Sequence, residues 1–179
     1  MHYTLCDMIA DITANSVEAG ATHITLECIQ TQDALDVTVA DNGKGMSSET
    51  LVKAEDPFFT DGKKHPNRKV GLGIPFLIQT AEETDGSWDI QSVPGKGTTV
   101  TMKFNLANID TPPVGNLPDL FLDVLTLPGN YDMDIHRTHD AAGLDYTVNR
   151  NELKDALGGE LESAESQILL RKFIESQEV

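Results

Sequence analysis

The chain has 179 residues and a formal net charge of −16, from 29 Asp and Glu residues against 13 Lys and Arg residues. This length predicts one domain, or one domain with an extension. Hydrophobic residues make up 39% of the chain, which is enough for a core and excludes a disordered acidic tail. A negative field repels phosphate groups, so the charge argues against nucleic acid binding.

Targeting signals are not recognisable in the sequence. The N-terminus has no basic region followed by an apolar run, and no stretch approaches the 18 apolar residues of a membrane span. We therefore expect a cytoplasmic protein that does not enter a membrane. Cys6 and Cys28 do not have metal-ligand spacing, so we expect both to be reduced and buried.

Residue spacing in the first part of the chain predicts a helix, two strands, a short helix, a loop, a second long helix and two strands. The long helices are expected over 5–19 and from 71–75 to about 83, and Ser47 or Ser48 can cap the short helix to residue 54. The expected strands are 22–28, 35–40, 87–93 and 98–104. A turn is expected at 31–33 and a loop at 56–70. This order predicts an α+β sandwich with helices on one sheet face.

A linker and an extension follow the first domain, which we place at residues 1–105. Residues 106–118 contain three prolines and a glycine, which is typical of a linker. Residues 119–179 form a C-terminal α+β extension that we expect to pack on or extend the first domain, because it is too small for an independent core. Its expected strands are 120–125, 131–137 and 144–148, followed by a helix capped by Asn151 and one capped by Ser163.

The first segment with residues suited to binding or catalysis lies in the first helix. Asp11 and Asn15 are four residues apart and therefore share one helix face. The amide oxygen can coordinate Mg²⁺, and the carboxylate can orient or deprotonate an attacking group. Alone, such a pair more commonly marks a solvated helix face.

The second and third segments are glycine loops. Residues 41–46 read Asp-Asn-Gly-Lys-Gly-Met at a strand end, where a buried carboxylate can accept a hydrogen bond from the exocyclic amine of adenine. The alternative for this segment is an ordinary turn. Residues 71–74 read Gly-Leu-Gly-Ile at a loop-to-helix junction, where free amides and the helix dipole favour an anion.

In this order, the segments resemble the motifs of the Bergerat-fold ATPases, a superfamily that contains gyrase, the heat-shock chaperone ATPase, histidine kinases and mismatch-repair ATPases. The resemblance covers about residues 5–105 and is closest to the catalytic domain of sensor histidine kinases. The matching segments are the N box at 15–21, the G1 box at 41–46, the histidine-kinase F box at 56–60, the G2 box at 71–74 and the last glycine–threonine segment at 95–99.

The resemblance implies a two-layer α/β sandwich that binds ATP and Mg²⁺, with helices on one face of a mixed, mostly antiparallel sheet. Asp41 would read the adenine amine, Asn15 would bind Mg²⁺, and Asp11 would be the catalytic acidic residue. The implied nucleotide-binding residues are Asn15, Asp41, Gly43, Gly45, Met46, Lys63, Lys64, Gly71, Leu72, Gly73, Ile74 and Thr98. Asp11 is one methylene shorter than the family's common Glu, which predicts slow hydrolysis or none.

The charge pattern adds a local exception to the acidic average. Residues 63–69 hold four of the 13 basic residues, in the loop that the family uses as an ATP lid. Lys63 and Lys64 are therefore expected to contact the β- and γ-phosphates, although a solvated surface loop is the alternative.

The sequence predicts a Mg-ATP-binding regulatory protein with kinase-like or slow ATPase activity, similar to sensor histidine kinases and anti-sigma-factor kinases. It would need a protein partner as phosphoacceptor. The alternatives are a non-catalytic ATP/ADP-sensing module that regulates a protein partner, and a degenerate domain without nucleotide. A homodimer stays open, and neither nucleic acid nor membrane is expected as a partner. Because the chain begins almost at the N box, we expect no autophosphorylation and no DNA-clamp role.

A metal site is a weaker hypothesis for the extension. Asp132, Asp134 and His136 alternate along one predicted strand face, with His139 nearby. Such a row could bind a metal ion, but an exposed acidic strand is the favoured interpretation.

Overall fold

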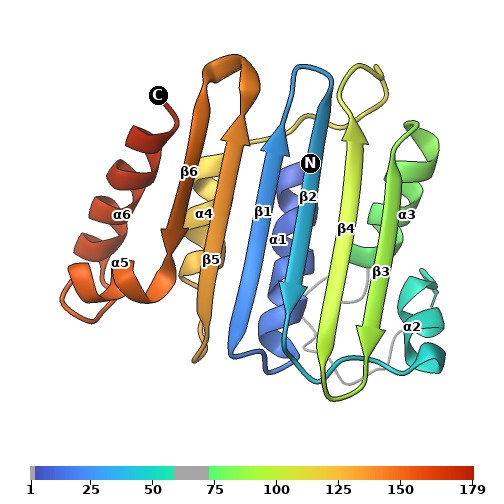
Figure 1. Ribbon diagram of the computed structural model, residues 1–179, viewed down its shortest axis with the longest axis horizontal. Coiled ribbons are helices and arrows are strands. Elements are labelled where there is room, and N and C mark those ends of the chain that lie inside the picture. The colour runs from blue at the N-terminus through green and yellow to red at the C-terminus, as the bar shows by residue number, and fades with distance from the viewer. Residues whose placement is uncertain (1–2, 59–72) are drawn as a thin grey trace.

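The computed structural model describes residues 3–58 and 73–179. Figure 1 shows these residues as a twisted sheet with helices behind it. In chain order the elements are α1 (Leu5–Glu18), β1 (His23–Gln30), β2 (Ala34–Asp41), α2 (Ser48–Glu55), α3 (Gly73–Glu83), β3 (Ser87–Val93), β4 (Gly97–Asn105), α4 (Leu117–Leu125), β5 (Asp132–His139), β6 (Leu144–Asn149), α5 (Arg150–Ala156) and α6 (Ala164–Gln177).

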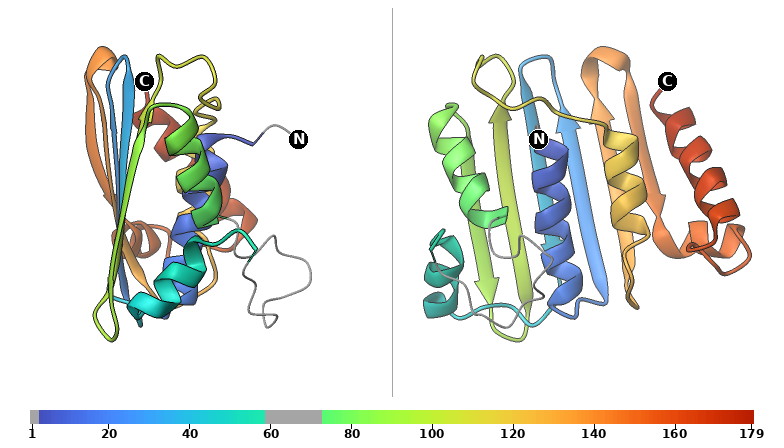
Figure 2. Two further views of the ribbon diagram at one scale, coloured as in Figure 1. Left: turned by 90° about the vertical axis from the view of Figure 1, so that its right-hand side faces the viewer. Right: turned by 180° about the vertical axis from the view of Figure 1, so that it is seen from behind.

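The strands form one six-stranded sheet in the order β3-β4-β2-β1-β5-β6. β1 and β5 run parallel, and every other neighbouring pair is antiparallel. The right-hand view of Figure 2 shows α1, α3 and α4 side by side on the same face of this sheet. The predicted sandwich, with helices on one face of a mixed and mostly antiparallel sheet, is therefore confirmed.

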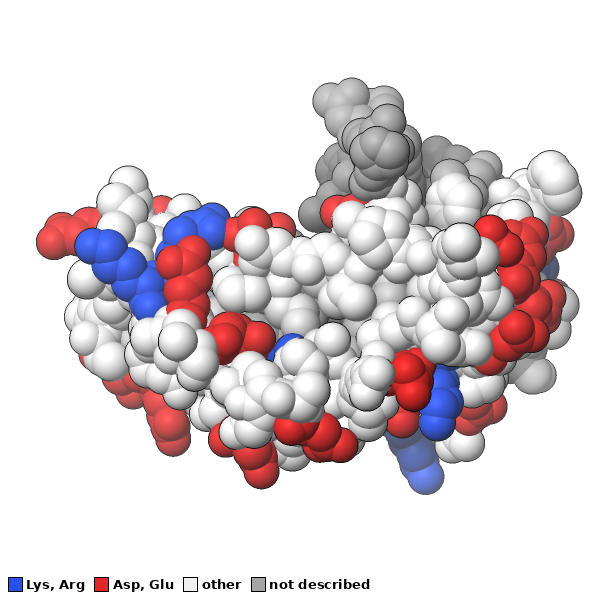
Figure 3. Space-filling model, turned by 90° about the horizontal axis from the view of Figure 1, so that it is seen from above, with Lys and Arg blue, Asp and Glu red and all other residues white. Residues whose placement is uncertain are grey.

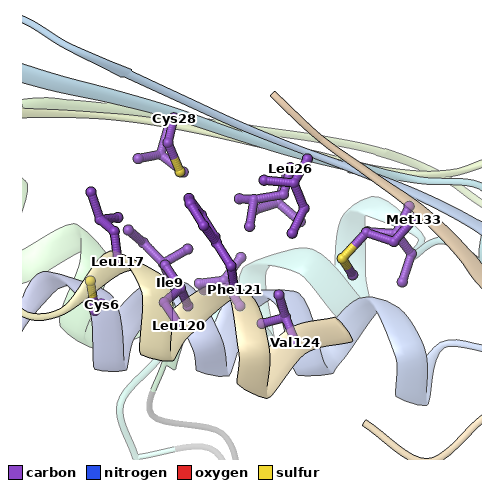
Figure 4. Packing of buried hydrophobic residues seen from close by; sticks show 14 of the residues in the cluster. Cys6, Ile9, Leu26, Cys28, Leu117, Leu120, Phe121, Val124 and Met133 are labelled. Atoms are coloured by element: carbon purple, nitrogen blue, oxygen red, sulfur yellow. The ribbon is translucent and has the colours of Figure 1, made fainter. Parts of the chain in front are cut away.

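The core lies between the sheet and these helices. Alternate residues of the central strands are buried, as Ile24, Leu26 and Cys28 are in β1, because successive side chains point to opposite faces. Figure 4 shows the ring of Phe121 of α4 directed toward Cys28 of β1, with Ile9 of α1 beside it. One cluster of buried residues includes side chains from α1, β1, β2, β4, α4 and β5. The two cysteines are free and buried, as the sequence predicted.

The predicted strand at 120–125 is wrong, because these residues belong to helix α4. Asn116 caps the helix by accepting a hydrogen bond from the Asp119 amide at 3.0 Å, and Pro118 lies in the first turn. The apolar positions 117, 120, 121, 124 and 125 have helical spacing and are buried. A continuous apolar run can form either element, and the cap and the spacing decide for a helix.

A second correction concerns the start of α5. Asn149 caps this helix, not Asn151, and its side-chain oxygen accepts a hydrogen bond from the Glu152 amide at 2.9 Å. The predicted caps at Ser47 and Ser163 are confirmed for α2 and α6. Among the helices that the structure describes, none is long and apolar enough to cross a membrane.

The segment that precedes α4 holds the start of α1. The amide groups of Leu5 and Cys6 each donate a 2.9 Å hydrogen bond, to the carbonyl oxygens of Pro113 and Val114 respectively. Thr4 caps the same turn, with Asp7 completing a reciprocal capping box. The first turn of α1 is thus fixed by a chain segment about 110 residues away, and this helix carries the first part of the candidate site.

Candidate functional site

The candidate site begins on the exposed side of α1. Asp11 is exposed and Asn15, one turn later, is half-buried, whereas Ile12 and Ser16 face inward. The Tyr3 hydroxyl donates a hydrogen bond to Asp11 Oδ2 at 3.0 Å. Burial, with the nearby Asp11 carboxylate, raises the pKa of Tyr3, so this hydroxyl stays protonated as a donor. One oxygen of Asp11 is therefore already engaged by the protein.

Asp41 ends β2 with both carboxylate oxygens held. Ser16 Oγ donates to Oδ2 at 2.6 Å, and the Gly43 amide donates to Oδ1 at 2.8 Å. Ser16 is 4% exposed, which fixes its hydroxyl inside the fold, whereas Asp41 is only half-buried. Because a carboxylate has about four acceptor positions, Asp41 is oriented and can still accept a hydrogen bond from a ligand.

Thr98 lies directly beside Asp41, since the two residues are paired in the β2–β4 register. The hydroxyls of Thr98 and Ser92 are 2.7 Å apart, and Ser92 Oγ also accepts a hydrogen bond from the Met46 amide at 2.7 Å. Ser92 therefore links the end of the β3–β4 hairpin to the glycine loop after β2. This arrangement brings Asp41, Met46 and Thr98 to one end of the sheet.

Two glycines allow the chain segments at this end to lie against each other. Gly45 has φ +65°, and a Cβ atom there would lie 2.0 Å from the carbonyl oxygen of Val93. Gly97 has φ +127°, and its Cβ would lie 1.9 Å from the carbonyl oxygen of Asp41. A side chain at either position would force backbone apart, so these glycines set the position of the loop relative to Asp41.

The start of α3 lies against α1. An added Cβ at Gly73 would be 3.2 Å from Asp11 Cβ, and half-buried Ile74 packs against the core. The rings of Tyr3 and Phe76 are 5.5 Å apart between centroids. The first turn of α3 is therefore next to the exposed side chains of α1. The positive end of the helix dipole of α3 favours an anion there.

The structure brings together nine of the predicted site residues around the ends of β2 and β4 and the facing parts of α1 and α3. These are Asp11, Asn15, Asp41, Gly43, Gly45, Met46, Gly73, Ile74 and Thr98. The predicted contacts of Lys63, Lys64, Gly71 and Leu72 lie outside the described residues.

Sequence reasoning missed two hydroxyl groups of the site. Ser16 follows Asn15 directly, but local spacing does not show that its hydroxyl reaches Asp41 at 2.6 Å. Ser92 is paired with Thr98 in the β3–β4 register. The predicted hairpin at 94–97 carried enough information for this pairing, since a short turn places its flanking residues opposite each other.

The row of acidic and histidine residues on β5 forms hydrogen bonds with neighbouring strands. His136 lies between Asp145 Oδ1 at 2.9 Å and Glu27 Oε2 at 3.3 Å, and His23 lies 3.1 Å from Asp134. No group of three metal-ligating side chains is found in residues 3–58 and 73–179. Within this range the polar row is an ion-pair and hydrogen-bond network of half-buried side chains, and not the exposed strand that was expected.

The face of the molecule that is seen from above keeps the acidic character of the composition. Seen from above, acidic side chains are spread over the visible face, and the basic ones lie in small separate groups beside acidic ones (Figure 3). Half of the eight basic residues in positions 1–103 lie in 63–69, which the structure does not describe. The surface charges described here therefore do not include the basic segment 63–69.

Comparison with known proteins identifies the first part of the chain. The family model described as histidine kinase-, DNA gyrase B-, and HSP90-like ATPase matches residues 3–108. A putative sensor protein of Shewanella frigidimarina is 32% identical over 109 residues, covering 59% of this chain and 16% of that protein. The tetrathionate sensor histidine kinase TtrS of Salmonella typhimurium is 31% identical, covering 54% of this chain and 16% of that protein.

Sporulation kinase C of Bacillus subtilis is 31% identical over 97 residues, covering 52% of this chain and 22% of that kinase. The chain thus spans less than a quarter of the length of these three relatives. A structure of the nucleotide-free catalytic domain of histidine kinase ThkA is 22% identical, covers 55% of this chain and 63% of that chain, and has a TM-score of 0.41. Because the family model matches more than half of the sequence, the chain belongs to the histidine kinase-, DNA gyrase B- and HSP90-like ATPases.

Proposed function

We propose that the chain binds Mg-ATP at the site formed by α1, the end of β2 and the start of α3, and that it acts as a regulatory kinase or slow ATPase. Family membership and the sensor-kinase relatives already indicate a kinase-like ATP-binding domain. The proposal goes further, because it assigns the metal, the residue roles and the chemistry.

The arrangement of Asp41 carries the proposal. Its two oxygens accept hydrogen bonds from Ser16 and Gly43, so the carboxylate cannot rotate freely. Both donors are neutral, which leaves the negative charge of Asp41 uncompensated by them. A fixed, charged acceptor at the half-buried end of a strand fits the exocyclic amine of adenine. Thr98, paired with Asp41 in register, would support the same ring edge through water.

The remaining roles follow from position around Asp41. Asn15 would hold Mg²⁺ through its side-chain oxygen, since hard cations prefer oxygen ligands. Bound Mg²⁺ would offset the repulsion between the phosphates and the acidic chain. Asp11, one turn earlier and beside Gly73, would orient the attacking group. Lys63 and Lys64 would contact the phosphates, and residues 71–74 would make the lid contacts.

Isothermal titration with ATP and Mg²⁺ tests this function. The wild-type chain should bind ATP, and Asp41→Asn should weaken binding by about tenfold to a hundredfold, because it removes a charge-assisted hydrogen bond. Asp33→Asn is the matched control, since Asp33 is exposed just before the opposite end of β2. Failure of the wild-type chain to bind any adenine nucleotide would refute the proposal.

A second candidate function is nucleotide sensing without catalysis. It is supported by the contact between the Tyr3 hydroxyl and Asp11 Oδ2, which occupies one oxygen of the short acidic side chain. In this function, nucleotide binding would change the affinity of the chain for a protein partner, and no phosphoryl group would be transferred.

Asp11→Asn separates the two functions when ATP binding and phosphate release or transfer from labelled ATP are measured together. For a catalytic protein, the variant should keep ATP binding and lose turnover. For a sensor, the wild-type chain should bind ATP, and neither form should release or transfer phosphate. Glu49→Gln is the control, because Glu49 is exposed on α2 and outside the proposed site, and it should change neither quantity.

A further inference from the structure

The helix layer extends past the sheet on the side of β6. In Figure 1 and in the right-hand view of Figure 2, α6 lies beyond the outer edge of β6. β6 is the last strand of the sheet order, so within the described residues it pairs with β5 alone. The other side of β6 is therefore an open strand edge, with backbone groups available for pairing.

A cavity of about 400 Å³ lies along this edge, between β6, α5 and α6. We call it the β6 groove. It is lined by Thr147, Val148, Asn149, Glu152, Leu153, Ala156, Leu157, Leu169, Leu170 and Phe173. Three of these, residues 147–149, are consecutive in β6. Successive side chains point to opposite faces, so a groove that touches all three reaches the strand edge in the C-terminal half of β6.

The helical wall of the β6 groove is apolar and incompletely covered. Leu169 and Phe173 of α6 line the groove and are 49% and 41% exposed. Leu170, also in the lining, is 1% exposed and anchors the helix to the core. An added strand beside β6 would lie over Leu169 and Phe173, as the existing strands lie over α1 and α4. Burial of these side chains would favour its binding.

Charge restricts what can occupy the groove. Glu152 is the charged residue in its lining, and residues 144–179, which contain β6, α5 and α6, hold 8 acidic against 4 basic residues. A second copy of this chain would bring the same excess of negative charge. A positively charged segment would be attracted, because opposite potentials across an interface speed association and select the partner.

We propose that the β6 groove binds an extended segment of a basic partner protein, which pairs with β6 as a seventh strand. Its main chain would satisfy the open edge, and its alternate apolar side chains would cover Leu169 and Phe173. The groove lies outside residues 3–108, the part matched by the ATPase family. The proposal is therefore independent of the nucleotide chemistry proposed above.

A short, fluorescein-labelled peptide of alternating lysine and valine provides the probe. Its binding to the full chain is measured by fluorescence anisotropy at physiological salt, and amide hydrogen exchange of residues 144–149 is followed in parallel. The peptide should bind and should slow exchange in β6. The same peptide with N-methyl groups on its valines keeps the charge and side chains but loses strand pairing, and it should bind at least about tenfold more weakly.

Variants of α6 complete the test. Phe173→Ser should weaken peptide binding by about tenfold, because it removes a large apolar contact. Ile168→Ser is the matched control, since Ile168 is 56% exposed on α6 but does not line the groove. If Phe173→Ser does not fold, as judged by circular dichroism, Leu169→Ser replaces it. The proposal is overturned by absent peptide binding, by equal binding of the N-methylated peptide, by equal effects of the groove and control variants, or by dimerisation of the chain through β6.

Discussion

Two carboxylates, Asp41 in the ATPase region and Glu178 in the extension, are each held by at least one side chain from a distant segment. Asp41 accepts hydrogen bonds from Ser16 and Gly43, which are neutral donors. Glu178 is 3.1 Å from the buried guanidinium of Arg137 and accepts a 2.6 Å hydrogen bond from the Tyr146 hydroxyl. The comparison separates two uses of a carboxylate: Glu178 is neutralised to join elements, whereas Asp41 is oriented with its charge available to a ligand.

The largest expected effect is a loss of unfolding free energy when the Arg137–Glu178 pair is broken. Its side chain is 2% exposed and also donates to Gln30 and to the Thr138 carbonyl. Arg137→Met should lower the free energy of unfolding by about 3 kcal/mol in urea titrations, because it leaves Glu178 without its charged partner.

The matched control for Arg137 is Lys103→Met. Lys103 pairs with Asp36 at 3.8 Å across the exposed sheet face. Its substitution should therefore cause no measurable change in the free energy of unfolding. Adding Glu178→Gln to Arg137→Met should recover part of the lost stability. Equal stability of the Arg137 variant and wild type would contradict a joining role for this pair.

Loss of a hydrogen bond to Asp41 should lower the unfolding free energy less, and should mainly weaken ATP binding. Ser16→Ala removes the 2.6 Å hydrogen bond to Asp41 Oδ2, so we expect a loss of about 1 kcal/mol in unfolding free energy and about threefold to tenfold weaker ATP binding. Ser87→Ala, on the exposed start of β3, should change neither quantity. If Ser16→Ala alters stability but leaves ATP affinity intact, Asp41 does not need this orientation to bind nucleotide.

The smallest expected effect is a pH dependence from β5. Hydrogen bonds to Asp145 and then Glu27 raise the pKa of His136 above its ordinary value. The protonated form is therefore favoured by folding, and its stabilising effect is complete below the ordinary pKa of His and is lost as pH rises through the folded value. Because His136 and Asp145 are partly exposed, the effect should be small and salt-sensitive.

Urea titrations between pH 6 and pH 8 can detect this effect. The wild-type chain should lose slightly more stability over this range than His136→Gln. Matching pH profiles of the two proteins would show that the hydrogen bonds of His136 do not favour its charged form.

The comparison also explains what the sequence could predict. The motifs around Asp41 are short and follow one another along the sequence. The sandwich, the strand end and the glycine loop were therefore predictable from these motifs and from the alternation of apolar residues. Ser16 was overlooked because its role depends on a contact 25 residues away. The network of Arg137 joins residues 41 and 107 positions apart, and no local pattern encodes such distances.

The extension was also harder to predict because its apolar run is ambiguous. Residues 120–125 are consecutive and mostly apolar, which fits a buried strand, but Asn116 and Pro118 start a helix before them. The helical spacing of the buried positions becomes clear when the run is extended back to residue 117. The cap, and not the composition, held the deciding information.

The most direct measurement of the role of Asp41 compares ATP with inosine triphosphate, in which a carbonyl group replaces the exocyclic amine. A fixed carboxylate acceptor should favour the amine and repel the carbonyl oxygen. Isothermal titration of the wild-type chain should show at least about tenfold tighter binding of ATP, and Asp41→Asn should largely abolish the difference. Equal affinity of the wild-type chain for the two nucleotides would contradict the assignment of Asp41 as the residue that reads adenine.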